Sequence, residues 1–229
     1  MSKKIAPRKA TRGNPMLSQE LITQTAMRML QTVPLRELTM RRLAQELGAT
    51  PAAVYGYFRS QDDLFDAINV QVLGSIDLDG LAGRTDWRAI LREWAHAVRR
   101  RQREIPHSVE IMQVRAQVPA RWLEICVPLI EALRSAGLED AALLNTLVVF
   151  QRVVSGSLLS EFSLATAQAD SGRGSVVAAL AHLPTPARQA WKTLAPHVAR
   201  IDNEALFNLT IDCVIAGIDA TLAARKARS

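Results

Sequence analysis

Residues 38–58 decide the fold of this chain, and they read LTMRRLAQELGATPAAVYGYF. Thr39 is placed to cap a short helix, and Gly48 is placed to end it. Thr50 and Pro51 then open a second short helix, because proline at the first helical position loses no needed N–H. Two short helices joined by a tight turn predict a helix-turn-helix, whose second helix enters the major groove of DNA.

The pattern of helices alone fits a DNA-binding helix-turn-helix and a helical hairpin without a DNA role equally well. The arginines and tyrosines in this segment favour DNA binding. Arg41 and Arg42 lie in the first turn of the first helix of the helix-turn-helix. The helix dipole disfavours cations there unless a phosphate or a base edge is near. Tyr55 and Tyr57 cannot both face inward, so at least one phenol is expected at solvent or at a DNA phosphate. A half-buried packing role is the alternative interpretation of such a tyrosine.

The positive charge of the chain is concentrated at the same end. The 229 residues include 28 Lys and Arg against 22 Asp and Glu, which gives a formal net charge of +6. Residues 1–60 hold ten of these cations and three of the acids, net +7, so the other 169 residues are net −1. A polyanion would therefore bind the first quarter of the chain, because cations that neutralise phosphates release condensed counterions.

Helical periodicity continues along the rest of the chain. Ser18 is placed to cap a first helix of about four turns, and Ser60 to cap one that continues through Val72. No stretch alternates polar and apolar residues as a half-buried strand does. The fold class is therefore predicted to be all-α, with further helices over residues 40–47, 51–58, 86–104, 107–116, 120–136, 139–163, 185–198 and 203–226 and a Gly/Ser-rich break at 168–176.

Composition indicates a soluble protein. Apolar residues make up 48% of the chain and charged residues 22%, which excludes wholesale disorder. We expect no apolar run of the roughly 18–20 residues that a bilayer requires, and no secretory signal follows the basic N-terminus. Cys126 and Cys213 cannot form a disulfide framework and are expected to be free thiols. These features predict a cytoplasmic protein that does not contact a membrane.

The helix-turn-helix segment also carries a family resemblance. Residues 38–58, followed by Asp62-Asp63-Leu64, resemble the DNA-binding domain of the tetracycline-repressor (TetR) family over about residues 17–66. The C-terminal part resembles the tetracycline-repressor branch more weakly, at Asp86-Trp87, Ala136-Gly137-Leu138, Gly156 with Glu161, and the closing helix. The resemblance implies a homodimer with a three-helix DNA-binding domain at 17–66 and a larger helical ligand-binding and dimerisation domain at 67–229. Residues 1–16 are basic and show no apolar period, so their composition predicts a disordered arm.

The resemblance also implies which residues contact DNA. Arg41 matches an arginine that reads a guanine, for which the bidentate fit of a guanidinium to that base is the physical reason. Gln61 stands where many members carry a phosphate-binding lysine, so it adds no charge. The basic residues between 3 and 12 are predicted either to compensate from the minor groove or to form a solvated tail. The predicted DNA-binding residues are Thr39, Arg41, Arg42, Thr50, Pro51, Ala53, Tyr55, Tyr57 and Gln61.

A ligand pocket inside each subunit is a further implication of the resemblance. Ordinary core packing is the alternative for each apolar candidate. The segment Glu110-Ile111-Met112-Gln113 has no histidine for a metal–tetracycline chelate, so neither that inducer nor any cofactor is expected. The predicted ligand-binding residues are Trp94, Val98, Met112, Trp122, Cys126, Phe150, Val154 and Glu161.

Two other features bear on ligand and dimer. The run Arg99-Arg100-Arg101-Gln102-Arg103 is predicted to be a solvated face partly opposed by Glu93 and Glu104, with contact to an anionic ligand as the alternative. The last two long helices carry apolar faces that predict a four-helix bundle with a twofold mate, and such a dimer binds a palindromic operator. These faces comprise Leu143, Leu147, Phe150, Val154, Leu158, Leu206, Leu209, Cys213 and Ile218.

No catalytic or metal-binding constellation emerges from the sequence. The four histidines are scattered, and Ser155-Gly156-Ser157 lacks the strand–turn–helix context of a nucleophile elbow. The sequence therefore predicts no enzyme but a ligand-responsive dimeric transcriptional regulator, a repressor released from its operator by a small molecule. The alternatives are a constitutive DNA-binding protein without an inducer, and a helical small-molecule-binding or catalytic protein whose helix-turn-helix has decayed.

Overall fold

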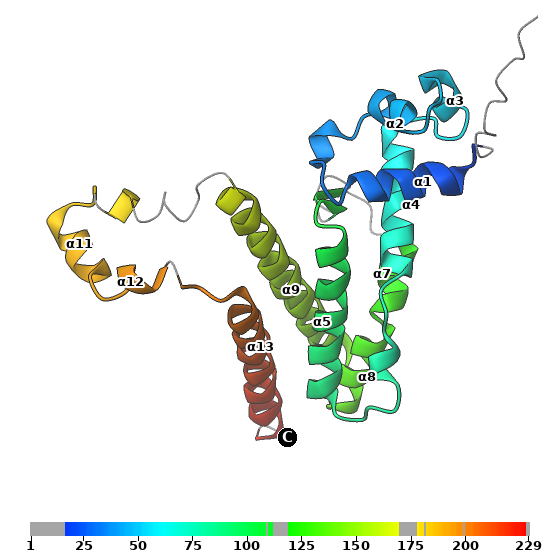
Figure 1. Cartoon of the computed structure of the whole chain (residues 1–229). Coiled ribbons are helices and arrows are strands. Elements are labelled where there is room, and N and C mark those ends of the chain that lie inside the picture. Colours follow the sequence, from blue (N-terminus) through cyan, green and yellow to red (C-terminus); the bar gives the residue numbers. More distant parts are fainter. Residues whose placement is uncertain are drawn as a thin grey trace, which may run out of the picture.

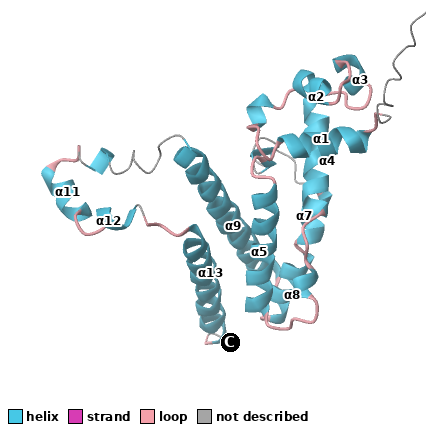
Figure 2. Ribbon diagram, viewed as in Figure 1, coloured by secondary structure: helices cyan, strands magenta, loops and turns pink. Residues whose placement is uncertain are grey.

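The computed structural model describes residues 17–108, 110–111, 119–169, 178–180, 182–198 and 200–227, with no side chains described for 162–169. The predicted arm at 1–16 and Met112 lie outside the described residues. Within the described ranges the chain folds into helices joined by turns and loops, and none of these residues lies in a strand (Figure 2). The all-α prediction is therefore confirmed.

The N-terminal helices form a compact head, which lies at the top of Figure 1. Serine and threonine side chains cap them as predicted, since Ser18, Thr39, Thr50 and Ser60 each accept the backbone N–H three residues on at 3.0–3.2 Å. The elements are α1 (Gln19–Met29), the 3₁₀ turn η1 (Leu35–Glu37), α2 (Met40–Glu46), α3 (Pro51–Tyr55) and α4 (Gln61–Gly74). They enclose the N-terminal core, which includes Ile22, Leu30, Leu38, Leu43, Val54, Leu64 and Ile68.

A larger helical body follows the head. Its elements are η2 (Asp79–Leu81), α5 (Trp87–Glu104), α7 (Ala120–Ile125), α8 (Val127–Ser135), α9 (Asp140–Ala169), α11 (Thr185–Trp191), α12 (Ala195–Val198) and α13 (Asn203–Lys226). Helix α5 packs against α8, α9 and α13, whereas α11 and α12 stand apart from this bundle in Figure 1. The C-terminal core of the body includes Leu73, Leu91, Trp94, Leu129, Leu133, Phe150, Phe207, Ile211 and Ile215.

Two connections join the head to the body. Helix α4 buries Leu64 in the N-terminal core and Leu73 in the C-terminal core. Beyond the end of α5, Ile105 and Ile111 pack into the N-terminal core, and the backbone N–H of His107 donates to the carbonyl of Leu30 at 3.4 Å. The domain boundary at residue 66 stays a prediction. The core of the head nevertheless includes Ile105 and Ile111, which lie about forty residues after that boundary.

Several element boundaries differ from the predicted ones. The first helix ends at Met29, short of the predicted fourth turn, and the helix expected over 120–136 breaks at Cys126. Pro128 explains the break, because it has no N–H to donate to the carbonyl four residues back. The helix expected over 185–198 is interrupted by a turn at 192–194.

Helix α9 is longer than expected. It continues through Ala169, so the first two residues of the predicted break at 168–176 are helical. Residues 164–169, which read LATAQA, contain no Gly or Pro, which explains why the helix does not stop. Residues 170–176 of that predicted break lie outside the described residues.

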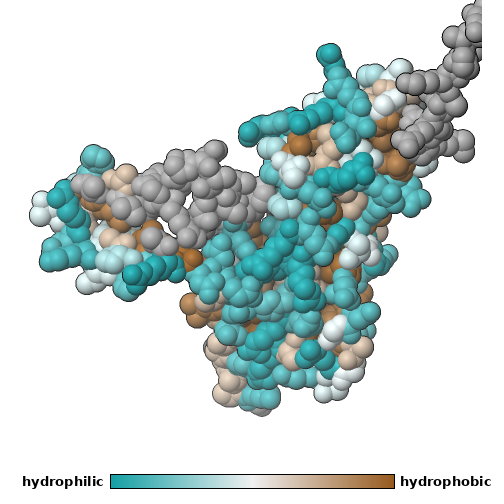
Figure 3. Space-filling model, in the orientation of Figure 1, coloured by the Kyte–Doolittle hydropathy of each residue, from teal (hydrophilic) through white to brown (hydrophobic). Residues whose placement is uncertain are grey.

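Helices α9 and α13 are unusually apolar. Asp140–Glu161 and Asn203–Lys226 are long and apolar enough, by length and composition, to cross a membrane, which corrects the expectation that no such run exists. Only 28% of each apolar window is buried within this chain. Figure 3 shows hydrophobic residues along the outer edge of the body at α13.

Candidate DNA-binding surface and ligand pocket

The turn between α2 and α3 sets the angle of the helix-turn-helix. Gly48 has a φ of +63°, a left-handed conformation that glycine adopts without steric cost. The backbone N–H of Ala49 then returns to the carbonyl of Ala44 at 2.9 Å. Ala44 and Val54 are fully buried where the two helices meet, so α3 turns its other side outward. This arrangement leaves the outer face of α3 available to a DNA groove.

The predicted DNA-binding residues lie on the surface of the head. Eight of the nine are exposed, and Gln61 is half-buried. The oxygens of Thr39 and Thr50 accept N–H groups as helix caps, while each hydroxyl proton stays available to a phosphate. Arg42 forms an ion pair with Glu37 at 2.6 Å, and both side chains are about 45% exposed. Arg42 would therefore have to exchange a carboxylate for a phosphate on binding DNA.

Two of these residues already make hydrogen bonds inside the protein. The Tyr57 hydroxyl donates to the carbonyl of Leu17 at 2.6 Å, and the Gln61 amide donates to the carbonyl of Leu38 at 2.8 Å. Gln61 thereby holds the start of α4 against the start of α2, a role that the sequence did not suggest. Tyr57 holds the start of α1, and its hydroxyl proton is not available to a phosphate in this structure.

Most of the predicted ligand-binding residues come together in the C-terminal core. Trp94 packs edge-on against Trp122 with ring centroids 5.7 Å apart, and it lies 6.0 Å from Phe150 at a tilt of 54°. Its indole N–H donates to the carbonyl of Ile125 at 2.7 Å. Val154 is also buried in this core, and Val98 is partly buried against it. Among the described residues these side chains pack against one another, and their ligand-binding role stays a prediction.

Cys126 belongs to the same core. Burial raises the pKa of its thiol to about 11, although a hydrogen bond from the Gln151 amide at 2.7 Å acts in the opposite direction. The thiol is therefore protonated near neutral pH and is a weak nucleophile. Cys213, in contrast, is exposed on α13, and both cysteines are free thiols as predicted.

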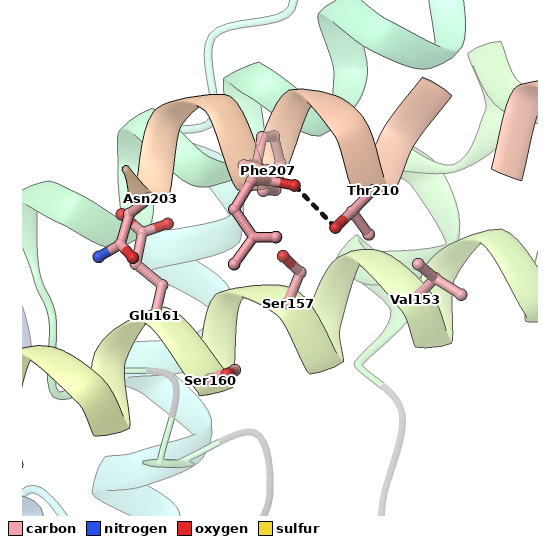
Figure 4. Close-up of a pocket in the computed structure, with 8 residues that line it drawn as sticks. Val153, Ser157, Ser160, Glu161, Asn203, Phe207 and Thr210 are labelled. Atoms are coloured by element: carbon pink, nitrogen blue, oxygen red, sulfur yellow. Dashed lines mark hydrogen bonds between the residues drawn. The ribbon is translucent and has the colours of Figure 1, made fainter. Parts of the chain in front are cut away.

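A cavity of about 210 Å³ lies between α9 and α13 (Figure 4). Its polar lining includes Ser157 and Glu161 from α9 and Asn203 and Thr210 from α13, and Phe207 contributes an apolar wall. Of the predicted ligand-binding residues that the structure describes, only Glu161 lines it. A second cavity, of about 320 Å³, lies between η2, the start of α5 and α8, and it includes Arg84 and Glu131.

Glu161 belongs to a cluster of charges that links α5, α9 and α13. Arg99 donates to Glu161 at 2.8 Å, to Glu204 at 2.7 Å and to the carbonyl of Asn203 at 2.9 Å. Its guanidinium lies 4.4 Å from the ring centroid of Phe207, and its side chain is only 3% exposed. The prediction that the arginine run is a solvated face is therefore wrong for Arg99. Its position on α5 turns it toward two acids that are distant in sequence.

Arg100 and Arg103 are about half exposed, as predicted for a solvated face, whereas the Arg101 side chain is only 16% exposed. Arg100 pairs with Glu93 at 3.0 Å and Arg101 with Glu104 at 2.6 Å, which are the two opposing acids that the sequence suggested. Arg103 is about half exposed and reaches Glu161 at 2.9 Å and Glu204 at 3.3 Å. Arg99, Arg103, Glu161 and Glu204 together form the Arg99 cluster, which carries two positive and two negative charges.

Glu161 should make folding stability depend on pH. Burial raises the pKa of its carboxyl, but hydrogen bonds and charge from Arg99 and Arg103 outweigh that effect and lower the pKa below its usual value. The unfolded chain then binds a proton at higher pH than the folded chain, so stability falls as pH decreases from about 4.3 through the folded pKa. We expect urea unfolding at several pH values to show a smaller acid-induced loss of stability in Glu161→Gln.

Glu139→Gln, which changes an exposed carboxylate, is the matched control for that experiment. It should keep the pH dependence of the wild type. Equal dependence in Glu161→Gln and wild type would refute the assignment of this effect to Glu161.

Comparison with known proteins agrees with this architecture. Residues 22–68 match the model of the tetR family of bacterial regulatory proteins, and residues 80–222 match that of the tetracyclin repressor-like C-terminal domain. A transcriptional regulator from Saccharopolyspora erythraea is 28% identical over 155 residues, which are 68% of this chain and 65% of that relative's length. The repressor DrrR1 from Streptomyces coeruleorubidus is 21% identical over a match that covers 97% of this chain and 85% of the length of DrrR1.

Solved structures include complexes with a small molecule and with DNA. ActR from Streptomyces coelicolor, in complex with actinorhodin, is 25% identical to this chain and superposes with a TM-score of 0.71. The match covers 90% of this chain and 98% of the ActR chain. BioQ with its double-stranded DNA operator is 27% identical with a TM-score of 0.59, over 65% of this chain and 89% of its own. The family models together cover both the head and the body. The chain therefore belongs to the tetR family of bacterial regulatory proteins, and it is a DNA-binding transcriptional regulator rather than an enzyme.

Proposed function

We propose that this protein is a dimeric repressor that binds a palindromic operator and is released from it by a small molecule. The observation that carries the proposal is the exposed face of the helix-turn-helix. Residues Thr50, Pro51, Ala53 and Tyr55 lie on the outer side of α3, and Arg41 is exposed on α2 beside it. The N-terminal quarter that contains them holds the whole positive excess of the chain. Hydroxyls, methyl groups and a guanidinium are suited to reading base edges.

Exposed apolar residues on α9 and α13 support the dimer. Six of the nine residues predicted for the bundle are buried within the chain: Leu143, Leu147, Phe150, Val154, Leu158 and Ile218. That part of the prediction is wrong because each helix has two apolar faces, and one of them packs against α5 and its neighbours. Leu206, Leu209 and Cys213 stay exposed, as do Leu144 and Val149, which the sequence did not single out. A second copy would bury this face.

The proposed ligand is a small molecule that binds in the body. The relative ActR binds actinorhodin, which supports a small-molecule ligand for this chain as well. The residues around Trp94 already fill their own space, so a ligand among them requires the aromatic cluster to open. Trp122 is only partly buried at the edge of this core, so we propose that its ring rotates to admit the ligand. A ligand that prefers the opened state would shift the head through α4 and thereby lower DNA affinity.

The proposal is tested with DNA selected from a random pool, because such a selection identifies the operator directly. The full chain should enrich an inverted repeat whose half-sites lie about one helical turn apart. A metabolite screen for release of that DNA then separates a ligand-responsive repressor from a constitutive DNA-binding protein. Failure to enrich any sequence over random DNA at physiological salt would favour a helical protein whose helix-turn-helix has decayed.

Replacement of Arg41 tests direct reading of a base. We expect Arg41→Ala to weaken binding to the selected DNA by about 1–3 kcal/mol and to relax the preference at one position in each half-site. Fluorescence anisotropy with single-base variants of the site measures both effects. Arg134→Ala, an exposed arginine on α8, should leave both unchanged. An equal loss of affinity on every sequence would instead make Arg41 a phosphate contact.

A further inference from the structure

The cavity between η2, the start of α5 and α8 (the η2 cavity) is separate from the proposed ligand site. None of the predicted ligand-binding residues that the structure describes lines it. Its volume of about 320 Å³ is at the lower end of the range for small-molecule pockets. Its lining combines a guanidinium, Arg84, and a carboxylate, Glu131, with the apolar residues Leu81, Ile90, Pro128 and Ala132. A largely apolar wall with a few charged groups is typical of sites for small molecules.

Arg84 is held in place at this cavity. Its Nε donates to the carbonyl of Gly80 at 2.5 Å, and a terminal nitrogen lies 3.8 Å from a carboxylate oxygen of Glu93. A Cβ atom at position 80 would lie only 3.0 Å from the Glu93 carboxyl group, so glycine allows η2 to pack closely on that side chain. Glu93 also pairs with Arg100 at 3.0 Å. One carboxylate is thus shared by two guanidinium groups, and the charge of Arg84 is only partly compensated.

Glu131 supplies the opposite charge. It lies on α8, its side chain is exposed, and it has no ion-pair partner within the described part of the chain. Arg84 and Glu131 line the same cavity, yet their charged groups are farther apart than the 4.0 Å that defines an ion pair. Each charge is therefore open to a ligand that enters the cavity.

We propose that the η2 cavity binds an apolar α-amino acid, with Arg84 as the partner of its carboxylate and Glu131 as the partner of its ammonium group. A guanidinium binds a carboxylate through charge-assisted hydrogen bonds, and a carboxylate binds an ammonium group in the same way. An apolar side chain on the ligand matches the apolar part of the lining. An amino acid carries all three features in a molecule small enough for this volume. The site is additional to the one in the proposed function, and its occupancy does not require DNA.

The position of the η2 cavity connects it to the head. Only residues 75–78 separate η2 from the end of α4, and Leu78 and Leu81 pack against the C-terminal core. Helix α4 contributes to the cores of both the head and the body. A ligand that joins Arg84 to Glu131 ties the segment after α4 to α8 and so restricts the movement of α4. A bound amino acid is therefore expected to change DNA affinity, and this regulatory part rests on the proposed function.

Binding is tested by isothermal titration calorimetry of the full chain with leucine and phenylalanine. Both should bind with one site per chain, whereas glutamate and lysine should not. N-acetyl-leucine lacks the ammonium group and leucinamide lacks the carboxylate, so each should bind at least about tenfold more weakly than leucine. Absence of binding by leucine and phenylalanine at millimolar concentration would overturn the inference.

Two variants assign the charged groups of the ligand to their partners. Arg84→Gln and Glu131→Gln should each weaken leucine binding about tenfold or more. Glu131→Gln should bind leucine no better than N-acetyl-leucine but still discriminate against leucinamide, and Arg84→Gln should show the reverse. Arg134→Gln changes an exposed arginine on the same helix and should bind all three compounds as the wild type does. Unchanged discrimination in both cavity variants would place the amino acid elsewhere in the protein.

The regulatory part is measured with the selected DNA. Saturating leucine should change the affinity of the wild type for that DNA by about fivefold or more, and the DNA should change leucine affinity by the same factor. Glu131→Gln should remove this response at the leucine concentration that saturates the wild type. Leucine binding without an effect on DNA affinity would overturn the regulatory part. Absence of any preferred DNA sequence would instead overturn the proposed function, and the calorimetry would still decide the site.

Discussion

Arg99→Ala is expected to lower the free energy of unfolding by about 3–5 kcal/mol, the range for removal of one partner from a buried ion pair. The substitution leaves Glu161, whose side chain is 19% exposed, without its closest cation, and it leaves the carbonyl of Asn203 without this donor. It also empties the space beside Phe207. Arg103 remains within reach of both acids, but its half-exposed side chain does not fill that space. Urea unfolding followed by circular dichroism measures the change.

Arg100→Ala is the matched control, because Arg100 is the next residue and also pairs with a glutamate, yet it is 54% exposed. Exposed ion pairs contribute about 0–1 kcal/mol, so this variant should differ little from the wild type. Arg99→Met retains much of the packing volume without the charge and separates the two contributions. If Arg99→Ala loses no more stability than Arg100→Ala, the Arg99 cluster does not hold α5, α9 and α13 together.

Leu209→Glu is expected to convert the protein to monomers and to reduce its affinity for a palindromic site by about 100-fold or more. Leu209 is 59% exposed on α13 within the apolar face proposed to bind a second copy, where a carboxylate would lose its water without gaining a partner. A monomer binds one half-site and loses the gain in effective concentration that the linked second half-site provides. Analytical ultracentrifugation gives the oligomeric state, and anisotropy gives the affinity for whole sites and half-sites.

Leu123→Glu is the control for this variant, since Leu123 is 61% exposed on α7, outside the proposed dimer face. It should remain a dimer and bind the whole site normally. A Leu209→Glu protein that stays dimeric would place the subunit contact elsewhere. One that becomes monomeric but binds the whole site as tightly as before would remove the dimer from the mechanism.

Local chemistry explains why the helix-turn-helix could be predicted in detail. The caps Thr39 and Thr50, the turn glycine Gly48 and the inward Val54 all act within a few residues of their own positions. Their effects can therefore be read from the sequence. Tyr57 and Gln61 looked equally local, but their partners lie 40 and 23 residues away. Nothing in the spacing of residues indicated that both side chains make hydrogen bonds within the head.

In the body, even more contacts join residues that are distant in sequence and so could not be predicted from local spacing. Arg99 pairs with acids 62 and 105 residues away, so its run of arginines resembled a solvated face. Helical periodicity located the apolar positions of α9 and α13 but did not indicate which face packs within the chain. Leu158 and Leu209 have the same side chain and are 3% and 59% exposed. Only the arrangement of α5 and its neighbours distinguishes them.

The contribution of Ile105 and Ile111 to the N-terminal core has a consequence for chimeric regulators. A head excised after α4 would keep every predicted DNA-binding residue but lose two isoleucines that are 3% and 0% exposed in the intact chain. The remaining apolar residues would then face water or the end of a foreign α5 that was not selected to fit them. Exchange of operator specificity between relatives should therefore succeed when the donor segment brings residues 105–111 with it, and should yield insoluble protein when it does not.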